Sequence, residues 1–160
     1  MNDVPSRLEQ LGFQLGRAWY AYLGLLDRLL AESNLGDDVQ PGMGNVLFAL
    51  FEQDGQTMGS LARRLRLSKS AVTRLVRRVG KAGLVETTAD TQDRRSTRVH
   101  LTPRAETLRE RCLALADRVQ QTLCDDLDDD EAASLTKLLE RVTETIRRHS
   151  QQADERRQLT

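Results

Sequence analysis

The chain has 160 residues, about the length of one domain. Hydrophobic residues make up 39% and charged residues 30%, which excludes a disordered chain, and two cysteines are too few for a disulfide framework. No apolar run approaches the ~18–20 residues that a membrane-spanning helix needs. The first residues also lack the basic-then-apolar order of a secretory signal, so we expect a cytoplasmic protein without a membrane partner.

The formal net charge is zero, but the charges are unevenly distributed along the chain. Residues 41–104 contain 12 basic and 5 acidic residues, a net charge of +7, and the remaining residues sum to −7. A basic segment between acidic ends is typical of a protein that binds a polyanion through one region, and the alternative is a solvated helix face. The arrangement of the basic side chains on their helix decides between the two.

The first predicted helix spans residues 6–33, where apolar residues recur at steps of three and four. Residues 33–36 end it. A second helix follows, with Pro41 at its first position, which suits a residue without a backbone N–H. After a turn, Thr57 is the expected N-cap of a short third helix.

The fourth predicted helix, over residues 69–82, separates apolar from basic side chains. Ser68 is its expected N-cap, and Gly83 suits its C-terminal stop. At about 100° per residue, the apolar residues fall in one stripe and the basic residues centre on the opposite side. The stripe consists of Val72, Leu75, Val76 and Val79, and the opposite face consists of Ser70, Arg74, Arg77 and Lys81, flanked by Thr73 and Arg78.

Two short runs of β-formers, residues 84–88 and 96–101, predict a hairpin with a polar tip. So small a hairpin is marginal alone, and we expect it to pack on the preceding helices. Thr102 is then the N-cap, and Pro103 the first residue, of a helix that runs to about residue 126.

An acidic cluster precedes the last predicted helix, where Asp128 and Glu131 resemble a capping box. The first helix and the last two each carry a wide apolar stripe, and three helices beside a small basic lobe give a thin core. Packing against a second copy buries these stripes, so the sequence predicts a two-fold homodimer.

The order helix, helix, tight turn, helix, hairpin is that of a winged helix-turn-helix, whose second helix enters the major groove of DNA. Small hydrogen-bonding residues come first on the helix at 69–82 and arginines follow, which suits contacts to base edges and phosphates. The basic hairpin tip can reach an adjacent minor groove. The candidate DNA-binding residues are Ser68, Lys69, Ser70, Thr73, Arg74, Arg77, Arg78, Asp93, Arg94, Arg95 and Arg98.

Residues 93–102 match the wing signature of the MarR-type transcriptional regulators, Asp-x-Arg, three residues, then Val-x-Leu-Thr. Residues 70–76 and 82–85 also resemble the recognition helix of that family and its exit. The resemblance implies a mainly α fold of six helices with a small β-hairpin wing after the fourth. It also implies a homodimer on a pseudo-palindromic operator of double-stranded DNA, usually a repressor released by a small molecule.

Carried over to this chain, the resemblance makes Asp93 the residue that orients the wing and Arg95 the minor-groove arginine. The sequence departs from the family at residues 86–88, Glu-Thr-Thr, where members often carry basic residues. We expect one intertwined domain in four parts. They are an N-terminal dimerisation helix (1–36), a DNA-binding winged-helix lobe (37–102), C-terminal dimerisation helices (103–150) and a polar tail (151–160).

Arg17, Trp19 and Tyr22 on the first helix are the candidate effector-binding residues. The two aromatic residues belong to the main aromatic cluster of a chain with 4% aromatic residues, for which core or dimer packing is the other interpretation. Resemblance to the family implies small aromatic anions as effectors, with which Arg17 or an arginine of the lobe would pair.

Cys112 and Cys124 leave a thiol-redox-responsive regulator of the same fold as an alternative, although Cys112 lies on an apolar stripe, where a small buried hydrophobe is commoner.

Two histidines without paired ligand spacing predict no metal site, and we expect no cofactor. Without a Gly-rich phosphate loop or a nucleophile elbow, we do not expect an enzyme. A winged-helix module that binds protein is a further alternative, but it would not need two arginines at the wing tip.

Overall fold

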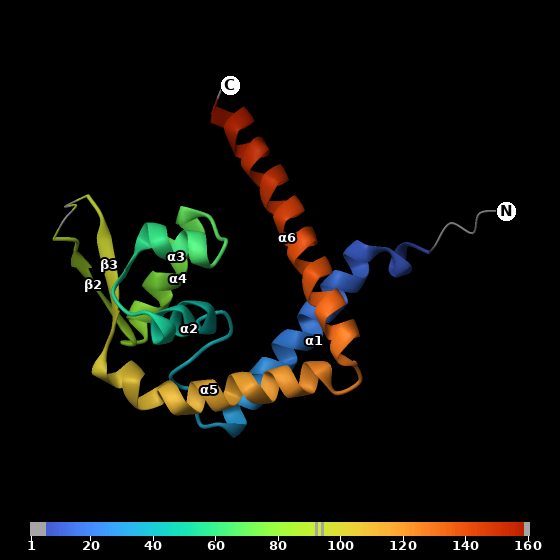
Figure 1. Cartoon of the computed structure of the whole chain (residues 1–160), viewed down its shortest axis with the longest axis horizontal. Coiled ribbons are helices and arrows are strands. Elements are labelled where there is room, and N and C mark those ends of the chain that lie inside the picture. The colour runs from blue at the N-terminus through green and yellow to red at the C-terminus, as the bar shows by residue number, and fades with distance from the viewer. Residues whose placement is uncertain (1–5, 92, 94, 159–160) are drawn as a thin grey trace. The chain divides into compact units, whose positions relative to one another are not determined.

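The computed structural model describes residues 6–91, 93 and 95–158, which divide into two compact units, Met1–Val119 and Gln120–Thr160. The first unit contains a 3₁₀ turn, most of the helices and a small sheet (Figure 1). Its elements are η1 (Arg7–Glu9), α1 (Leu11–Glu32), α2 (Gly44–Glu52), β1 (Gln56–Thr57), α3 (Met58–Arg64), α4 (Lys69–Lys81), β2 (Val85–Ala89), β3 (Thr97–Leu101) and most of α5 (Pro103–Cys124). The second unit holds the end of α5 and α6 (Asp129–Gln158). The mainly helical fold with a small β wing is the predicted one.

Three element boundaries differ from those predicted by more than two residues. The first helix is interrupted at Gln10, whose backbone is extended (φ −67°, ψ 145°). The prediction that Pro41 begins the second helix is wrong, because Gly42 has φ +88°, a left-handed conformation that a right-handed helix cannot contain, and α2 begins at Gly44. Helix α6 continues to Gln158, well into the segment predicted to be a polar tail.

The helix-turn-helix is defined by two side-chain caps, both predicted. Thr57 Oγ1 accepts a hydrogen bond of 3.1 Å from the backbone N–H of Ser60 at the start of α3. Ser68 Oγ accepts one of 3.2 Å from the N–H of Ala71 at the start of α4. Each cap satisfies a backbone donor that the first helical turn leaves without a partner, and so fixes where its helix begins.

The wing is an antiparallel sheet of three strands in the order β1-β3-β2. Its hairpin pairs Val85 with Leu101 at the base and Ala89 with Thr97 near the tip. Strand β1 is not predicted from the sequence, because two residues are too short to show an alternating pattern. Gln56 of β1 has a buried side chain whose Nε2 donates to the carbonyl oxygens of Ala49 and Gln53, so β1 is joined to α2 as well as to β3.

The buried core lies entirely in the first unit. The C-terminal end of α1 and helices α2, α3, α4 and α5 contribute to it, together with β2, β3 and the segment before α2. Its most enclosed residues are Leu35, Val46, Leu47, Leu50, Leu61, Val72, Val79, Leu84 and Val99. Of the side chains that the structure describes in the second unit, none is buried, and the large apolar residues Leu135, Leu138, Leu139 and Ile146 of α6 are exposed.

Candidate nucleic-acid interface

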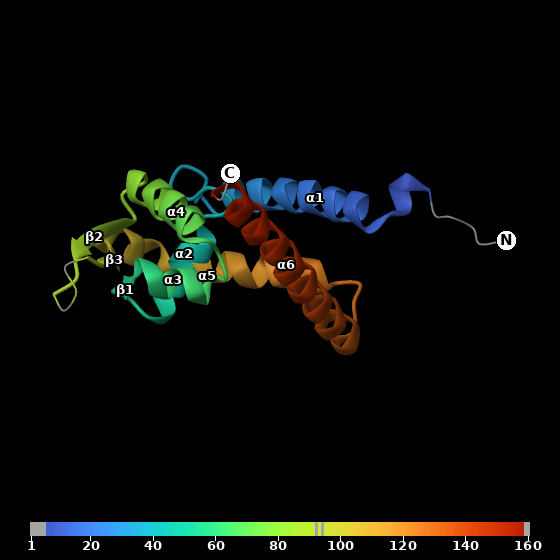
Figure 2. The ribbon, with the colours of Figure 1, turned by 90° about the horizontal axis from the view of Figure 1, so that it is seen from above.

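Helix α4 presents one buried face and one solvent face, as its sequence predicts. Val72, Val76 and Val79 are buried in the core, and Leu75 packs against it. The candidate residues on the other face are all exposed: Ser68, Lys69, Ser70, Thr73, Arg74, Arg77 and Arg78. Because the apolar stripe holds α4 on the core, its basic side chains face solvent. In the view of Figure 2, α4 lies beside β2 of the wing.

The start of α4 is electropositive and suited to an anion. Its first turn has no acidic residue, and Lys69 occupies its first position, where the partial positive charge of the helix dipole adds to the ammonium charge. The hydroxyl of Thr73 donates to the Lys69 carbonyl at 2.8 Å, and Ser68 Oγ lies 3.1 Å from Ser70 Oγ. These hydroxyl oxygens keep acceptor capacity for an incoming donor such as a base edge.

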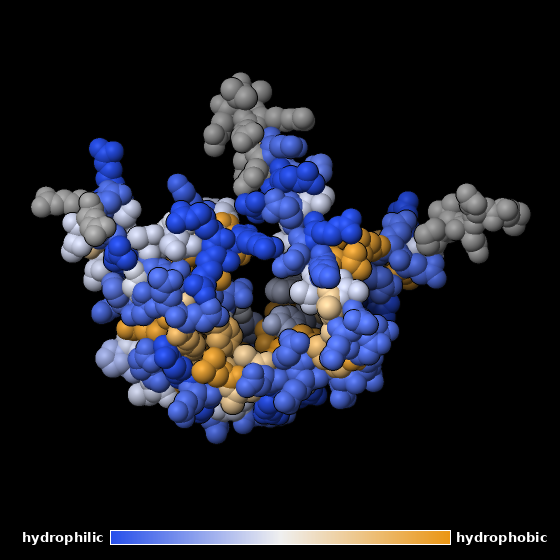
Figure 3. Space-filling view, in the orientation of Figure 1, coloured by the Kyte–Doolittle hydropathy of each residue, from blue (hydrophilic) through white to orange (hydrophobic). Residues whose placement is uncertain are grey.

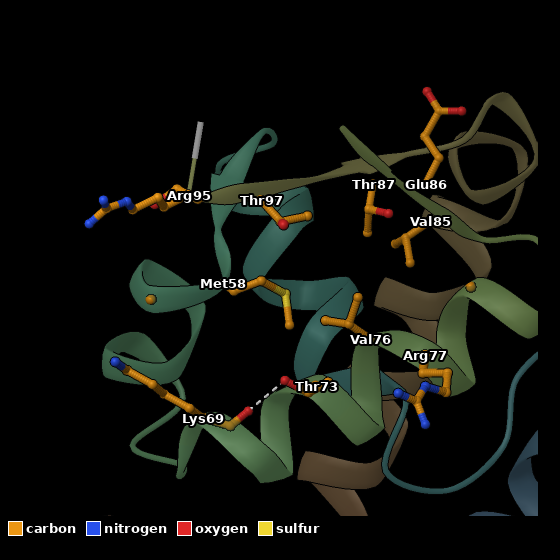
Figure 4. Close-up of a pocket in the computed structure, with 13 residues that line it drawn as sticks. Met58, Lys69, Thr73, Val76, Arg77, Val85, Glu86, Thr87, Arg95 and Thr97 are labelled. Carbon is orange, nitrogen blue, oxygen red and sulfur yellow. Dashed lines mark hydrogen bonds between the residues drawn. The ribbon is translucent and has the colours of Figure 1, made fainter. Parts of the chain in front are cut away.

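A groove of about 770 Å³ separates α4 from the wing (Figure 4). Lys69, Thr73 and Arg77 line it from α4, and Arg95 lines it from the wing. Its floor includes apolar side chains of α3, α4 and β2. The remaining lining residues are Met58, Gly59, Val76, Gly80, Val85, Glu86, Thr87, Ser96 and Thr97. The groove therefore brings together candidate residues from two elements that are far apart in the sequence.

The wing tip is held by the backbone and side chain of Asp93. Its carboxylate accepts hydrogen bonds from the backbone N–H of Arg95 at 3.0 Å and from the hydroxyl of Ser96 at 2.9 Å, and its carbonyl accepts from the Ser96 N–H at 2.8 Å. Asp93 thus orients Arg95 through the backbone, and the exposed Arg95 side chain projects from the wing (Figure 4). Arg94, also a candidate, lies outside the described residues.

Two of the candidate arginines are engaged in contacts within the protein. Arg98 forms an ion pair with the buried Asp90, with Nε 2.7 Å from Oδ2, and donates from a terminal nitrogen to the carbonyl of Gly55 at 2.7 Å. Arg78 donates to the carbonyl of Pro41 at 3.1 Å. The structure therefore separates Arg98 from the solvent-facing basic residues, and it adds Asp90, which the sequence analysis did not single out.

Glu86 is an acidic residue at the base of the wing. In Figure 4 its side chain points away from α4, whereas Val85 and Thr87 point toward it. This alternation follows from the period of two in a β-strand. The carboxylate therefore faces the side of the sheet on which its register partner His100 lies.

The candidate effector residues do not share one face of α1. The rings of Trp19 and Tyr22 lie together, with centroids 6.2 Å apart and planes inclined at 39°. Arg17 is two residues before Trp19, a rotation of about 200° around the helix, so it lies on the opposite side. The aromatic pair and the cation are thus separated within one chain, and Trp19 remains 55% exposed.

The two cysteines have different surroundings. Cys112 is buried in the core, and burial raises the pKa of its thiol above the ordinary value, an effect that Arg111 partly offsets. Cys124 is half-buried, and its sulfur accepts from the side chain of Gln120 at 3.1 Å. A raised pKa lowers the thiolate fraction of Cys112 and with it the reactivity that a redox sensor needs.

The structure also bears on metal binding and on membrane-spanning helices. In the part of the chain that the structure describes, no three His, Cys, Asp or Glu side chains are grouped so as to hold a metal ion. Over the same residues, no helix is both long and apolar enough to cross a membrane.

Known proteins resemble this chain in sequence over the helix-turn-helix and wing, and in structure over most of its length. Residues 43–97, from the start of α2 to the wing, match the MarR family. YsmB of Bacillus subtilis (strain 168), described as an uncharacterized HTH-type transcriptional regulator, is 29% identical over 99 residues, which is 62% of this chain and 68% of that protein. The PcaV transcriptional regulator of Streptomyces coelicolor, solved with its natural ligand, superposes with a TM-score of 0.76 over 90% of this chain and 98% of its own, at 24% identity. MepR of S. aureus, solved as a DNA complex, gives 0.70 over 88% and 99%, at 22% identity.

Proposed function

We propose, on the premise that this chain belongs to the MarR family of DNA-binding transcriptional regulators, that it acts in the cytoplasm as a homodimeric repressor of a pseudo-palindromic operator. One observation carries the proposal. The exposed basic face of α4 lies opposite a buried apolar stripe, and Arg95 faces it across the groove. Such an arrangement suits a helix in the major groove with a basic wing in the neighbouring minor groove.

The roles within the interface follow from position and chemistry. Ser70 and Thr73, near the start of α4, carry short hydroxyls that allow close approach to base edges. Arg74 and Arg77 follow one turn later and contact guanine or phosphate. Arg95 enters the minor groove. Ser68, Lys69 and Arg78 contact the phosphate backbone, and Arg94 accompanies Arg95 at the wing tip.

The homodimer is supported by the apolar residues of the terminal helices. Leu11 and Tyr20 on α1 and Leu138 on α6 are among the large side chains that remain exposed in the single chain. Hydrophobic side chains appear at the surface near the N-terminal end of α1 in Figure 3. A two-fold partner would bury such surfaces and place two recognition helices on half-sites about 10 base pairs, or a small multiple of turns, apart.

The salt dependence of binding tests the DNA interface. Sites selected from random duplex DNA are labelled, and binding is followed by fluorescence anisotropy as the salt is raised. If six or more phosphates are neutralised, affinity falls about 10³-fold or more between about 50 and 200 mM salt. Binding that is equally strong at both concentrations would contradict the interface and favour a module that binds protein.

Alanine substitutions assign the individual residues. Arg74→Ala and Arg95→Ala are each expected to weaken operator binding by about 1–3 kcal/mol. Arg141→Ala is the matched control, since Arg141 is an exposed arginine on α6 and does not belong to the winged-helix lobe. Equal affinities for all three variants would remove Arg74 and Arg95 from the interface.

The proposal includes release of the operator by a small aromatic or anionic effector. The exposed Trp19 and its neighbour Tyr22 offer an aromatic surface, and PcaV has been solved with its natural ligand. Trp19 is the single tryptophan of the chain, so its fluorescence reports directly on this surface. Titration with phenolic anions such as salicylate should change that fluorescence and lower operator affinity, and no response in either signal counts against the effector.

A further inference from the structure

The wing contains one buried acid, in a lobe whose solvent face is basic. Asp90 follows β2 at the start of the wing tip and is only 4% exposed. Both oxygens of its carboxylate have partners. Oδ1 accepts from the backbone N–H of Asp93 at 3.2 Å, and Oδ2 lies 2.7 Å from Nε of Arg98 on β3. Its own N–H donates to the carbonyl of Ser96 at 2.9 Å, which closes the tip.

These bonds form one continuous chain from the body of the lobe to the wing tip. Arg98 anchors it at the Gly55 carbonyl, in the turn between α2 and β1. Asp90 connects Arg98 to Asp93, and Asp93 in turn holds the backbone N–H of Arg95. The backbone of Arg95 is therefore held relative to α2 and β1 by three side chains, those of Arg98, Asp90 and Asp93, that do not themselves line the groove.

Burying a carboxylate is costly unless it is paired and hydrogen-bonded, and a negative charge in a DNA-binding lobe also weakens attraction to phosphates. We propose that Asp90 and Arg98 act as a pair of positioning residues that hold the wing tip, and with it Arg95, in the geometry that binds DNA. The inference rests on the proposed role of Arg95 in DNA binding. It gives Arg98 a different role from that of a phosphate contact.

Two single substitutions with opposite charge changes separate positioning from electrostatics. Asp90→Asn removes a negative charge, and Arg98→Gln removes a positive one. Long-range electrostatics alone predicts that the first raises operator affinity and the second lowers it. Positioning predicts that both lower it, by about tenfold, the effect of losing one arginine contact. Glu86→Gln is the control for charge, because it removes an exposed carboxylate from the same wing and should raise affinity slightly.

Coupling to Arg95 completes the test. The carboxylate of Asp90 is connected to the backbone of Arg95 through Asp93, so a role in positioning makes the effects of Asp90→Asn and Arg95→Ala non-additive. In an Arg95→Ala background, Asp90→Asn should then cost less than twofold. The double variant Asp90→Asn/Arg98→Gln, whose net charge is unchanged, should lose no more affinity than either single variant. Thermal unfolding and sedimentation show whether each variant is folded and dimeric. If Arg98→Gln is not, Arg98→Lys replaces it, because lysine keeps the charge but not both contacts.

The outcomes separate this inference from the proposed function. If Asp90→Asn binds the operator as well as or better than the wild type, the positioning role is overturned while the DNA interface stands. Full additivity of Asp90→Asn with Arg95→Ala also overturns it. If Arg95→Ala binds as the wild type does, the role of Arg95 fails first, and a loss with Asp90→Asn would then act through another part of the wing.

Discussion

The winged-helix lobe and α6 differ in whether their large apolar side chains are buried or exposed. In the lobe, Leu50 and Leu84 are fully enclosed, and the stripe of α4 lies in the same core. On α6, Leu138 has the same chemistry and is 52% exposed. The core of the lobe, to which α1 and α5 also contribute, is therefore buried within one chain, whereas α6 presents a surface of the kind that a partner covers. Stability of the lobe and assembly of the proposed dimer should accordingly respond to different substitutions.

The largest effect is expected from a cavity in the lobe. Leu50→Ala removes three carbon atoms from a site with no exposed surface, and should lower the free energy of unfolding by about 2–5 kcal/mol. Urea unfolding measures it. Lys137→Ala changes an exposed position outside the apolar stripe of α6 and is the comparison. A loss below about 1 kcal/mol for Leu50→Ala would show that the core of the lobe relaxes around the cavity.

A smaller effect is expected on assembly from the apolar stripe of α6. Leu138→Ala should weaken the dimer by about 1–3 kcal/mol, since truncation of a central apolar anchor has this effect at interfaces. Sedimentation equilibrium at several protein concentrations measures the dissociation constant. Lys137→Ala is the control, because Lys137 lies about 100° away on the polar side of α6. If both variants remain equally dimeric, α6 does not supply the interface.

A backbone position in the lobe should show an effect of about 1 kcal/mol. Gly83 ends α4 with φ +71°, where a side chain is strained, and a Cβ there would lie 3.4 Å from a terminal nitrogen of Arg104. Gly83→Ala should therefore lower the free energy of unfolding by about 1 kcal/mol. Gly24→Ala on α1 meets no atom within 4 Å and should raise helix stability instead. The same sign for both variants would contradict the argument.

Features of the fold that depend on a few adjacent residues could be predicted from the sequence, and features that depend on distant residues could not. Periodicity and caps located α3 and α4 because each depends on a few adjacent residues, such as Thr57 and Ser68 with the N–H groups they accept from. The start of α2 was misplaced because the left-handed backbone of Gly42 is not visible in the residue pattern. Strand β1 was missed because its two residues are defined by pairing with Val99 and Arg98, more than 40 residues later.

The candidate site shows the same limit. The basic face of α4 follows from spacing alone, so its exposed residues could be named in advance. The contacts of Arg98 could not be predicted from the residue pattern, since its ion pair with Asp90 depends on the register of the hairpin and its bond to Gly55 depends on a distant turn. Local patterns therefore predict which surface is basic, and long-range contacts decide which basic side chains are available to DNA.

The smallest effect is expected for Cys112, whose position tests whether the lobe core is closed on its α5 side. The thiol is buried and burial raises its pKa, so little thiolate forms at pH 7–8 and the sulfur is inaccessible to reagent. In a Cys124→Ser variant, which leaves Cys112 as the single thiol, reaction with a disulfide reagent should follow the rate of opening of the lobe and should not increase as the pH rises from 7 to 8. Reaction at the rate of a free thiol would show that α5 separates from the core in the native state, and would restore the thiol-redox alternative. Operator affinity should stay the same as long as Cys112 has not reacted, because its sulfur then remains within the core of the lobe.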